Sequence, residues 1–290
     1  MNINKWLINN TDSLYGKTVA ITGSTGGLGK EICKYLAQLG TNLILLDRNR
    51  IKSENHGTEL IKDFPDISIK YITVDLSDIN SVKKACEILN SIDLDILILN
   101  AGVYNIPRIK CSTGFDNIFQ VNFVSQYYLS YKILPKLREK NGKIIAVGSI
   151  AHFMTKIKNN DIELLNCKNS EKIYGNSKRF LMYSLYDMAE KENDIKINIV
   201  HPGITYTNLM SNYPAWISQI IKYPMKNIFM SPEKAALSVI KGIFTECKNY
   251  EWIGPEILGI WGKPKQFKLK KLSESETVCI HEVTSKTVKI

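Results

Sequence analysis

The stretch Thr18–Gly29, which reads TVAITGSTGGLG, decides the fold of this chain. Its first five residues are apolar or β-branched, which is typical of a buried strand. The glycines that follow let the backbone turn tightly and approach an anion with no Cβ in the way. Gly29–Leu39 then places its apolar side chains on one helical stripe, and Gly40 ends the helix. This order of strand, turn and helix predicts a phosphate site at the helix N-terminus.

The same alternation of strands and helices continues along the chain. Five more strand-like runs follow, separated by stretches long enough for helices: Asn42–Asp47, Ile69–Val74, Ile96–Asn100, Lys143–Ser149 and Ile195–His201. Several runs are almost wholly apolar, as in a parallel sheet covered on both sides. We therefore expect an α/β protein with a doubly wound Rossmann fold, in which a mostly parallel seven-stranded sheet has helices on both faces. Pro135 should kink or end the helix within Phe115–Lys140, and Ser231-Pro232-Glu233 should begin a late helix.

The domain organisation follows from length and composition. A chain of 290 residues, 44% hydrophobic and 23% charged, fits one large globular domain. We expect an N-terminal extension at residues 1–16, a single Rossmann-type domain at 17–262 and a basic C-terminal tail at 263–290. Residues 205–230 are aromatic, apolar and interrupted by proline, which predicts a lid over an apolar ligand. The alternative is a peripheral helical pair that only completes the core.

The composition argues against several classes of protein. Six scattered cysteines and four histidines predict free thiols and no metal site. No apolar run approaches the ~20 residues of a membrane-spanning helix. Residues 1–15 lack the pattern of a signal peptide, so we expect a cytoplasmic location. The net charge is +10, but the densest cluster, Lys263–Lys271, is interpreted as a solvated tail, so no nucleic-acid partner is expected.

Further motifs follow the glycine loop in a fixed order. The loop itself has the pattern T-G-x-x-x-G-x-G, not G-x-G-x-x-G. Asn100-Ala101-Gly102 ends the fourth strand-like run, and Asn122 lies in the next helix. Ser149 ends the fifth run, Tyr174-x-x-x-Lys178 comes after it, and Pro202-Gly203 follows the sixth. With these motifs, Lys17–Glu246 resembles the compact single-domain form of the short-chain dehydrogenase/reductase family. The resemblance implies a Rossmann fold and an NAD(P) cofactor.

The nucleotide preference depends on two neighbouring residues. Asp47 ends the second strand-like run, 18 residues past Gly29, where a carboxylate can bind both ribose hydroxyls of NAD and repel a 2′-phosphate. Arg48 follows, and in the family a basic residue there favours NADP. We expect NAD or NADP, with NAD favoured. By resemblance Asp75 contacts the adenine, although it could instead cap a helix.

The resemblance assigns the whole nucleotide site to positions along the strand ends. Thr207 matches the family threonine that bonds the nicotinamide carboxamide. The expected set is Gly23, Thr25, Gly27, Leu28, Gly29, Asp47, Arg48, Asp75, Leu76, Asn100, Ala101, Gly102, Tyr174, Lys178, Pro202, Gly203, Ile204 and Thr207.

The chemistry is expected to centre on Tyr174 and Lys178. Residues four apart share one face of a helix, and a nearby ammonium lowers the pKa of a phenol. Tyr174 could therefore exchange the proton that accompanies hydride transfer. By resemblance Ser149 bonds the substrate oxygen, Lys178 also holds the nicotinamide ribose, and Asn122 continues a proton relay. Without the resemblance, Ser149 is a strand-end cap and Asn122 a satisfied helix amide.

The spacing of the catalytic motif indicates a branch of the family. Ser149 and Tyr174 are 25 residues apart, and the segments Asn159–Asn166 and Trp252–Lys265 resemble the retinol-dehydrogenase-like branch. That branch acts on lipophilic alcohols, aldehydes and ketones, so we expect an oxidoreductase for an apolar alcohol or carbonyl substrate. Arg179-Phe180-Leu181 departs from the Leu-Ala-Asn usual there, so the substrate itself is not carried over.

The sequence is also compatible with other functions. A regulator that binds nicotinamide nucleotides without turnover is the main alternative, and nucleotide-sugar epimerases rank last. Peripheral membrane contact through Trp216–Phe229 and the C-terminal lysines could coexist with catalysis. A homo-oligomer is compatible with the fold.

Overall fold

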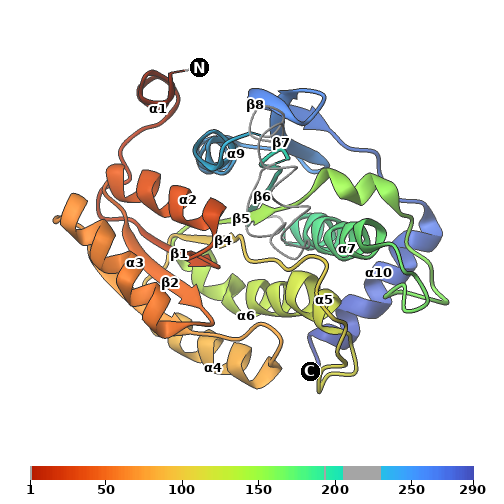
Figure 1. Ribbon diagram of the computed structural model, residues 1–290. Helices are drawn as coiled ribbons and strands as arrows, with labels where there is room; N and C mark the ends of the chain where they lie inside the picture. Colours follow the sequence, from red (N-terminus) through yellow and green to blue (C-terminus); the bar gives the residue numbers. More distant parts are fainter. Residues whose placement is uncertain (1, 193, 205–229) are drawn as a thin grey trace, which may run out of the picture.

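The computed structural model describes residues 2–192, 194–204 and 230–290, and one sheet runs through them (Figure 1). Its eight strands lie in the order β3-β2-β1-β4-β5-β6-β7-β8. Strands β1 to β7 are parallel, and β8 pairs antiparallel with β7. The strand order reverses between β1 and β4, which is where doubly wound sheets bind ligands. The strands are β1 (Thr18–Thr22), β2 (Asn42–Asp47), β3 (Ile69–Thr73), β4 (Ile96–Leu99), β5 (Lys143–Val147), β6 (Lys196–Val200), β7 (Glu251–Ile257) and β8 (Trp261–Lys268).

Helices cover both faces of the sheet (Figure 1). One buried cluster joins the sheet to α1 (Ile3–Asn10), α2 (Gly27–Gln38), α3 (Arg50–Asp63) and α9 (Pro232–Phe244). The second cluster joins it to α4 (Ile79–Asn90), α6 (Ser125–Glu139), α7 (Ser170–Lys191) and α10 (Glu274–Thr287). Three short elements complete the described helices: α5 (Asn117–Phe119), the π-helical turn η1 (Gln120–Val124) and the 3₁₀ turn η2 (Ile150–Met154). The expected doubly wound α/β fold is confirmed.

The predicted elements agree with the structure most closely near the glycine loop. The first two strands have the predicted bounds, and α9 begins at Pro232 as expected. Pro135, by contrast, does not end its helix, because α6 continues to Glu139. Pro135 and Tyr131 both face solvent, where water can bond the carbonyl that the proline leaves without a donor.

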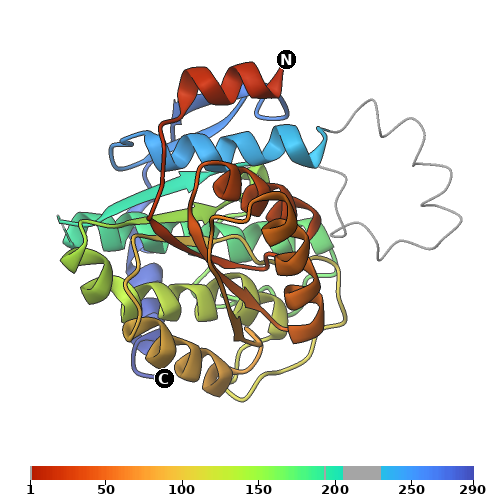
Figure 2. The same cartoon turned by 90° about the vertical axis from the view of Figure 1, so that its left-hand side faces the viewer.

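The two ends of the described chain pack on the central unit. α1 lies beside α9 and buries Trp6 and Leu7 (Figure 2). Residues 263–290, predicted as a basic tail beyond a boundary at 262, form most of β8 and the helix α10. The predicted boundary therefore falls inside β8, and the sheet has eight strands where seven were predicted. Ser273 and Glu276 form a capping box at the start of α10, a local signal that could have located the helix.

Two further expectations can be compared with the described residues. All six cysteines are free thiols, as predicted. None of the helices in the described ranges has the length and apolar character that crossing a membrane requires. Of the predicted lid at 205–230, all but Met230 lies outside the described residues, and so does Thr207.

Candidate active site

The glycine loop between β1 and α2 requires glycine at two positions, because a side chain there would collide with the backbone. Gly23 has a φ of +68°, and a Cβ there would lie 3.0 Å from the Cα of Ala101. A Cβ at Gly29 would overlap the backbone oxygen of Gly23. The first turn of α2 therefore packs directly on the loop, and Gly27 and Leu28 begin the helix. The free N–H groups of such a turn suit a pyrophosphate.

The ends of β1 and β4 are joined by a small hydrogen-bond network. Thr22 Oγ1 accepts from the backbone N–H groups of Asn100 and Ala101, both at 3.0 Å. The side-chain amide of Asn100 donates to the carbonyls of Thr22 and Gly23, at 3.0 and 2.9 Å. Asn100-Ala101-Gly102 is thereby held against the glycine loop, as its place in the expected nucleotide site requires.

Asp47 is bound to the glycine loop through its own carboxylate. The residue is 4% exposed. Its carboxylate accepts from Ser24 Oγ, from the backbone N–H and hydroxyl of Thr25 at 3.3 and 3.2 Å, and from Ser53 Oγ at 2.9 Å. Arg48, in contrast, is exposed. The carboxylate that was expected to contact the ribose therefore also shapes the loop that would hold the phosphates.

Asp75 follows β3 and does not cap the next helix. Its carboxylate accepts from the backbone N–H and hydroxyl of Ser77, at 2.9 and 2.7 Å. Asp78 is the residue that caps α4, so the alternative role considered for Asp75 belongs to its neighbour. Leu76 is buried, and its carbonyl accepts from Ser125 Oγ at 2.6 Å.

Pro202-Gly203-Ile204 follows β6 at the same edge of the sheet. Gly203 has a φ of +85°, and a Cβ there would lie 2.7 Å from the backbone oxygen of Ile260. Only glycine suits this turn. Just after this turn, the carbonyl of Ile204 accepts a hydrogen bond from Met230 N–H at 3.0 Å.

Tyr174 and Lys178 lie one turn apart on α7, as predicted. Lys178 is 2% exposed, and its ammonium donates to the carbonyl of Val147 at 2.8 Å. Lys178 Nζ lies 6.0 Å from the centroid of the Tyr174 ring. Burial lowers the pKa of Lys178 to about 8. Burial also raises the pKa of Tyr174 to about 12, and a hydrogen bond with Ser149 lowers it only in part. The sequence predicts a lowered pKa for this phenol, but the effect of desolvation prevails.

Close backbone packing brings Ser149 to Tyr174 across 25 residues. Ser149 begins η2, and its hydroxyl accepts from Ala151 N–H at 3.2 Å. A Cβ at Gly175 would overlap the carbonyl of Ala151, so α7 lies directly on this turn. The buried His152 contacts the Ser149 carbonyl through Nδ1 at 2.7 Å. The sequence gives no signal for Gly175 or His152, because neither forms a motif on its own.

Asn122 holds the loop after β4 through its side chain. Its amide donates to the carbonyl of Val103 at 2.9 Å and to Ser177 Oγ at 3.0 Å, and its Oδ1 accepts from Val103 N–H at 2.8 Å. A Cβ at Gly102 would lie 3.3 Å from Asn122 Oδ1 and 3.4 Å from Lys178 Nζ. Asn122 lies in the π-helical turn η1, a feature frequent at functional sites. The amide is therefore satisfied, and the relay through Asn122 stays a prediction.

An ion pair that the motifs do not contain braces this region. Arg179, next to Lys178, donates to Glu276 of α10 from Nη2 at 2.8 Å and from Nε at 3.1 Å. Glu276 also accepts from Ile157 N–H at 3.0 Å. The side chains of Arg179 and Glu276 are only 12% and 10% exposed. The C-terminal helix α10 is thus tied to α7 and to the segment that follows Ser149.

The residues present fit a dinucleotide. Gly23 and Gly29 let the loop pack tightly on Ala101 and on the first turn of α2, whose N-terminus could bind a pyrophosphate, and the buried ammonium of Lys178 lies beside Gly102 at the switch point of the sheet. Fold and site together define a Rossmann-type nucleotide-binding protein with a tyrosine–lysine pair.

The comparison with known families agrees with this class. The sequence profile of short chain dehydrogenases matches residues 17–218. The chain therefore belongs to the short-chain dehydrogenase/reductase family.

Individual relatives are consistent with the expected branch. Mouse retinol dehydrogenase 12 is 31% identical over 202 residues, which are 68% of this chain and 64% of that protein. The match thus spans less than two thirds of that relative's length. Human polyprenol dehydrogenase is 24% identical over 85% of this chain and 75% of its own. The resemblance to the retinol-dehydrogenase-like branch is confirmed.

Solved structures share the fold. An uncharacterized protein from Mycobacterium paratuberculosis superposes with a TM-score of 0.75 at 19% identity, over 97% of this chain and 96% of its own. A short-chain dehydrogenase from Sphingobium yanoikuyae, solved in complex with NADPH, has a TM-score of 0.63 at 21% identity, over 78% and 84% of the two chains.

Proposed function

We propose that this protein is an NAD(P)-dependent oxidoreductase that interconverts an alcohol and a carbonyl compound. The observation that carries the proposal is that Lys178, Asn122 and Gly102 lie together at the strand ends beside the glycine loop. Tyr174 and Ser149 adjoin this group. Family membership supports it. The bound nucleotide supplies the hydride chemistry, and the protein supplies binding, orientation and the proton.

The chain's own residues divide the remaining work. The N-terminus of α2 would hold the pyrophosphate. The Ser149 hydroxyl would orient the substrate oxygen. With a pKa of about 12, Tyr174 is protonated at neutral pH and can donate its proton to that oxygen as a carbonyl is reduced. With a pKa of about 8, Lys178 is largely an ammonium there and stabilises the phenolate that remains.

The substrate class is part of this proposal. Relatives named for retinol and polyprenol favour a lipophilic alcohol or carbonyl compound. Cytoplasmic location, contact with a membrane surface and self-association stay predictions.

Turnover on a panel of alcohols and ketones, with both nucleotides, tests the function. We expect Tyr174→Phe to lose about 10²-fold or more in kcat, the scale for a missing general acid, and to keep nucleotide affinity. Unchanged turnover in that variant contradicts the role of Tyr174. Tight nucleotide binding by wild type with no turnover on the panel favours the regulator instead.

The nucleotide preference is tested separately. The expected preference for NAD rests on Asp47, whose carboxylate accepts hydrogen bonds from the glycine loop. The neighbouring Arg48 is exposed and would favour NADP. Thermal shifts measured side by side with NADH and NADPH decide between the two nucleotides.

A further inference from the structure

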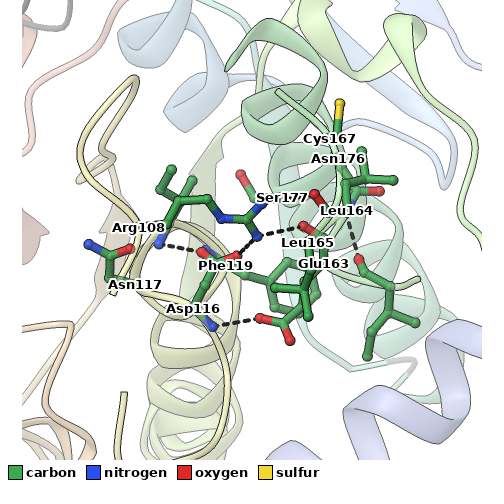
Figure 3. Close-up of polar contacts among 12 residues, drawn as sticks. Arg108, Asp116, Asn117, Phe119, Glu163, Leu164, Leu165, Cys167, Asn176 and Ser177 are labelled. Atoms are coloured by element: carbon green, nitrogen blue, oxygen red, sulfur yellow. Dashed lines mark hydrogen bonds and ion pairs between the residues drawn. The ribbon is translucent and has the colours of Figure 1, made fainter. Parts of the chain in front are cut away.

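The segment that separates Ser149 from Tyr174 is fastened by one arginine. Residues 159–167 contain neither helix nor strand. Arg108, from the loop after β4, donates from Nη1 to the carbonyl of Leu164 at 2.8 Å and from Nη2 to that of Glu163 at 2.9 Å. Nη2 also forms an ion pair with Asp116, and Figure 3 shows the guanidinium between these partners. The planar fork of an arginine suits such multiple contacts, which a lysine cannot reproduce.

Asp116 connects the same segment to the helix that carries Asn122. Its backbone N–H donates to Glu163 Oε2 at 2.5 Å. Its Oδ1 accepts from the N–H groups of Ile118 and Phe119, at 2.8 and 3.0 Å, and so begins α5. The Asp116 side chain is 6% exposed. One carboxylate thus balances the charge of Arg108 and caps a helix six residues before Asn122.

A third attachment joins the segment to the catalytic helix. Asn176, two residues past Tyr174, donates to the carbonyl of Ile162 at 2.7 Å (Figure 3). Leu164 has a φ of +53°, which is rare for a leucine. Its side chain is buried with Ile118 and Ile173. A backbone conformation of this kind persists only where the surroundings impose it.

The fastened segment packs against the loop that contacts the catalytic tyrosine. Val103 and Ile106 pack against the apolar cluster that contains Leu164, and Val103 is the residue that Asn122 holds. The next residue, Tyr104, sets its ring edge-on against that of Tyr174, with centroids 5.5 Å apart. The loop after β4 therefore adjoins the phenol through Tyr104, and residues 159–167 pack against that loop through Leu164.

We propose that Arg108 and Asp116 determine which substrates are accepted, because they fasten residues 159–167 as a fixed support for the loop after β4, whose Tyr104 forms a wall beside Tyr174. The inference rests on the proposed function. A bulky apolar alcohol or ketone contacts the wall and is oriented by it, whereas a small one reaches Tyr174 without it. Fixing the wall in advance removes an ordering cost from the binding of bulky substrates.

The test compares four variants across a series of secondary alcohols and their ketones with increasing alkyl length. Arg108→Met removes the guanidinium, Arg108→Lys keeps the charge without the fork, and Asp116→Asn keeps a capping acceptor. The control is Arg138→Met, because Arg138 is likewise an arginine held in ion pairs, with Glu192 and Asp194, but at the end of α6 remote from Asn122. Hydrogen exchange of residues 159–167 is measured in each variant.

For Arg108→Met we expect kcat/KM to fall about tenfold to 100-fold for the longest substrates, mainly through KM, since small misplacements near a reaction centre cost that much. The shortest substrate and nucleotide affinity should change little, and exchange in 159–167 should rise. For Arg108→Lys and Asp116→Asn we expect losses in kcat/KM for the longest substrates that are smaller than the loss for Arg108→Met. These two variants test the proposal if Arg108→Met does not fold. Arg138→Met should keep the wild-type size profile.

Three results overturn the proposal. Faster exchange with an unchanged size profile shows that the wall does not select substrates. An equal loss of kcat/KM for substrates of every alkyl length shows that Arg108 supports the structure in general and does not select substrates. Absence of turnover in nucleotide-bound wild type overturns the proposed function as well, and the exchange data then still report whether Arg108 holds the segment.

Discussion

The two halves of the sheet fix their site residues by different means. At the glycine loop, the shape of the backbone fixes the site, because Gly23 has a positive φ and Gly29 has no room for a Cβ. Around Tyr174, side chains reach across long stretches of sequence: Lys178 to Val147 over 31 residues, Arg108 to Leu164 over 56, and Arg179 to Glu276 over 97. The nucleotide half is therefore encoded locally, and the catalytic half depends on tertiary contacts that single substitutions can remove.

The largest expected effect on stability in this comparison comes from Glu276→Gln. The change leaves the largely buried guanidinium of Arg179 without its charged partner, which should lower the free energy of unfolding by about 3 kcal/mol at pH 7. Urea denaturation measures the loss. The control is Glu246→Gln, since Glu246 pairs with Lys196 in solvent, with side chains 76% and 45% exposed, and should cost less than about 1 kcal/mol.

The same pair predicts a pH dependence. Burial raises the pKa of Glu276, but hydrogen bonds from Ile157 N–H and Arg179, with the charge of Arg179, outweigh it and leave the pKa below its ordinary value of 4.5. The carboxylate therefore stabilises the fold above pH 4.5, and this contribution disappears as the pH falls through the lower, folded-state pKa. The stability difference between wild type and Glu276→Gln should shrink in acid. A difference that stays constant from pH 7 to strong acid contradicts the assignment.

Gly29→Ala tests the locally encoded half. The new Cβ would overlap the carbonyl of Gly23, which should cost about 1 to 3 kcal/mol of stability and weaken nucleotide binding. Thermal unfolding and fluorescence titration with the nucleotide measure both effects. Gly26→Ala is the matched control, because its Cβ would lie 3.6 Å from the same oxygen, an ordinary contact. Equal losses in the two variants would mean that packing at Gly29 is not what shapes the loop.

Arg48→Ala should give the smallest effect of these substitutions. It tests how the nucleotide site distinguishes NADPH from NADH. If the exposed guanidinium meets a 2′-phosphate, NADPH affinity falls about threefold to tenfold, the scale of an exposed charge contact, and NADH affinity is retained. Titrations with both nucleotides measure the ratio. A ratio identical to that of wild type removes Arg48 from nucleotide discrimination.

Much of the fold was predictable because its signals are local. The apolar runs of β1 and β2 gave the strand bounds. The order of motifs placed Gly23 and Ser149 after strands, and Asn122, Tyr174 and Lys178 in helical elements. The lysines before α10 favour a solvated tail, whereas the capping box of Ser273 and Glu276 at its start indicates a helix. The roles of His152 and Gly175 had no local signal, since each depends on which backbone lies opposite.

The sequence by itself determined the alternation of strands and helices, the glycine loop and the family, because periodicity and steric exclusion act over a few neighbouring residues. Only the tertiary structure decided the environment of Tyr174. Burial there raises the pKa of the phenol to about 12, and Arg108 and Arg179 find partners 56 and 97 residues away. Desolvation and ion pairing depend on which atoms lie close in space, and chain order does not specify that.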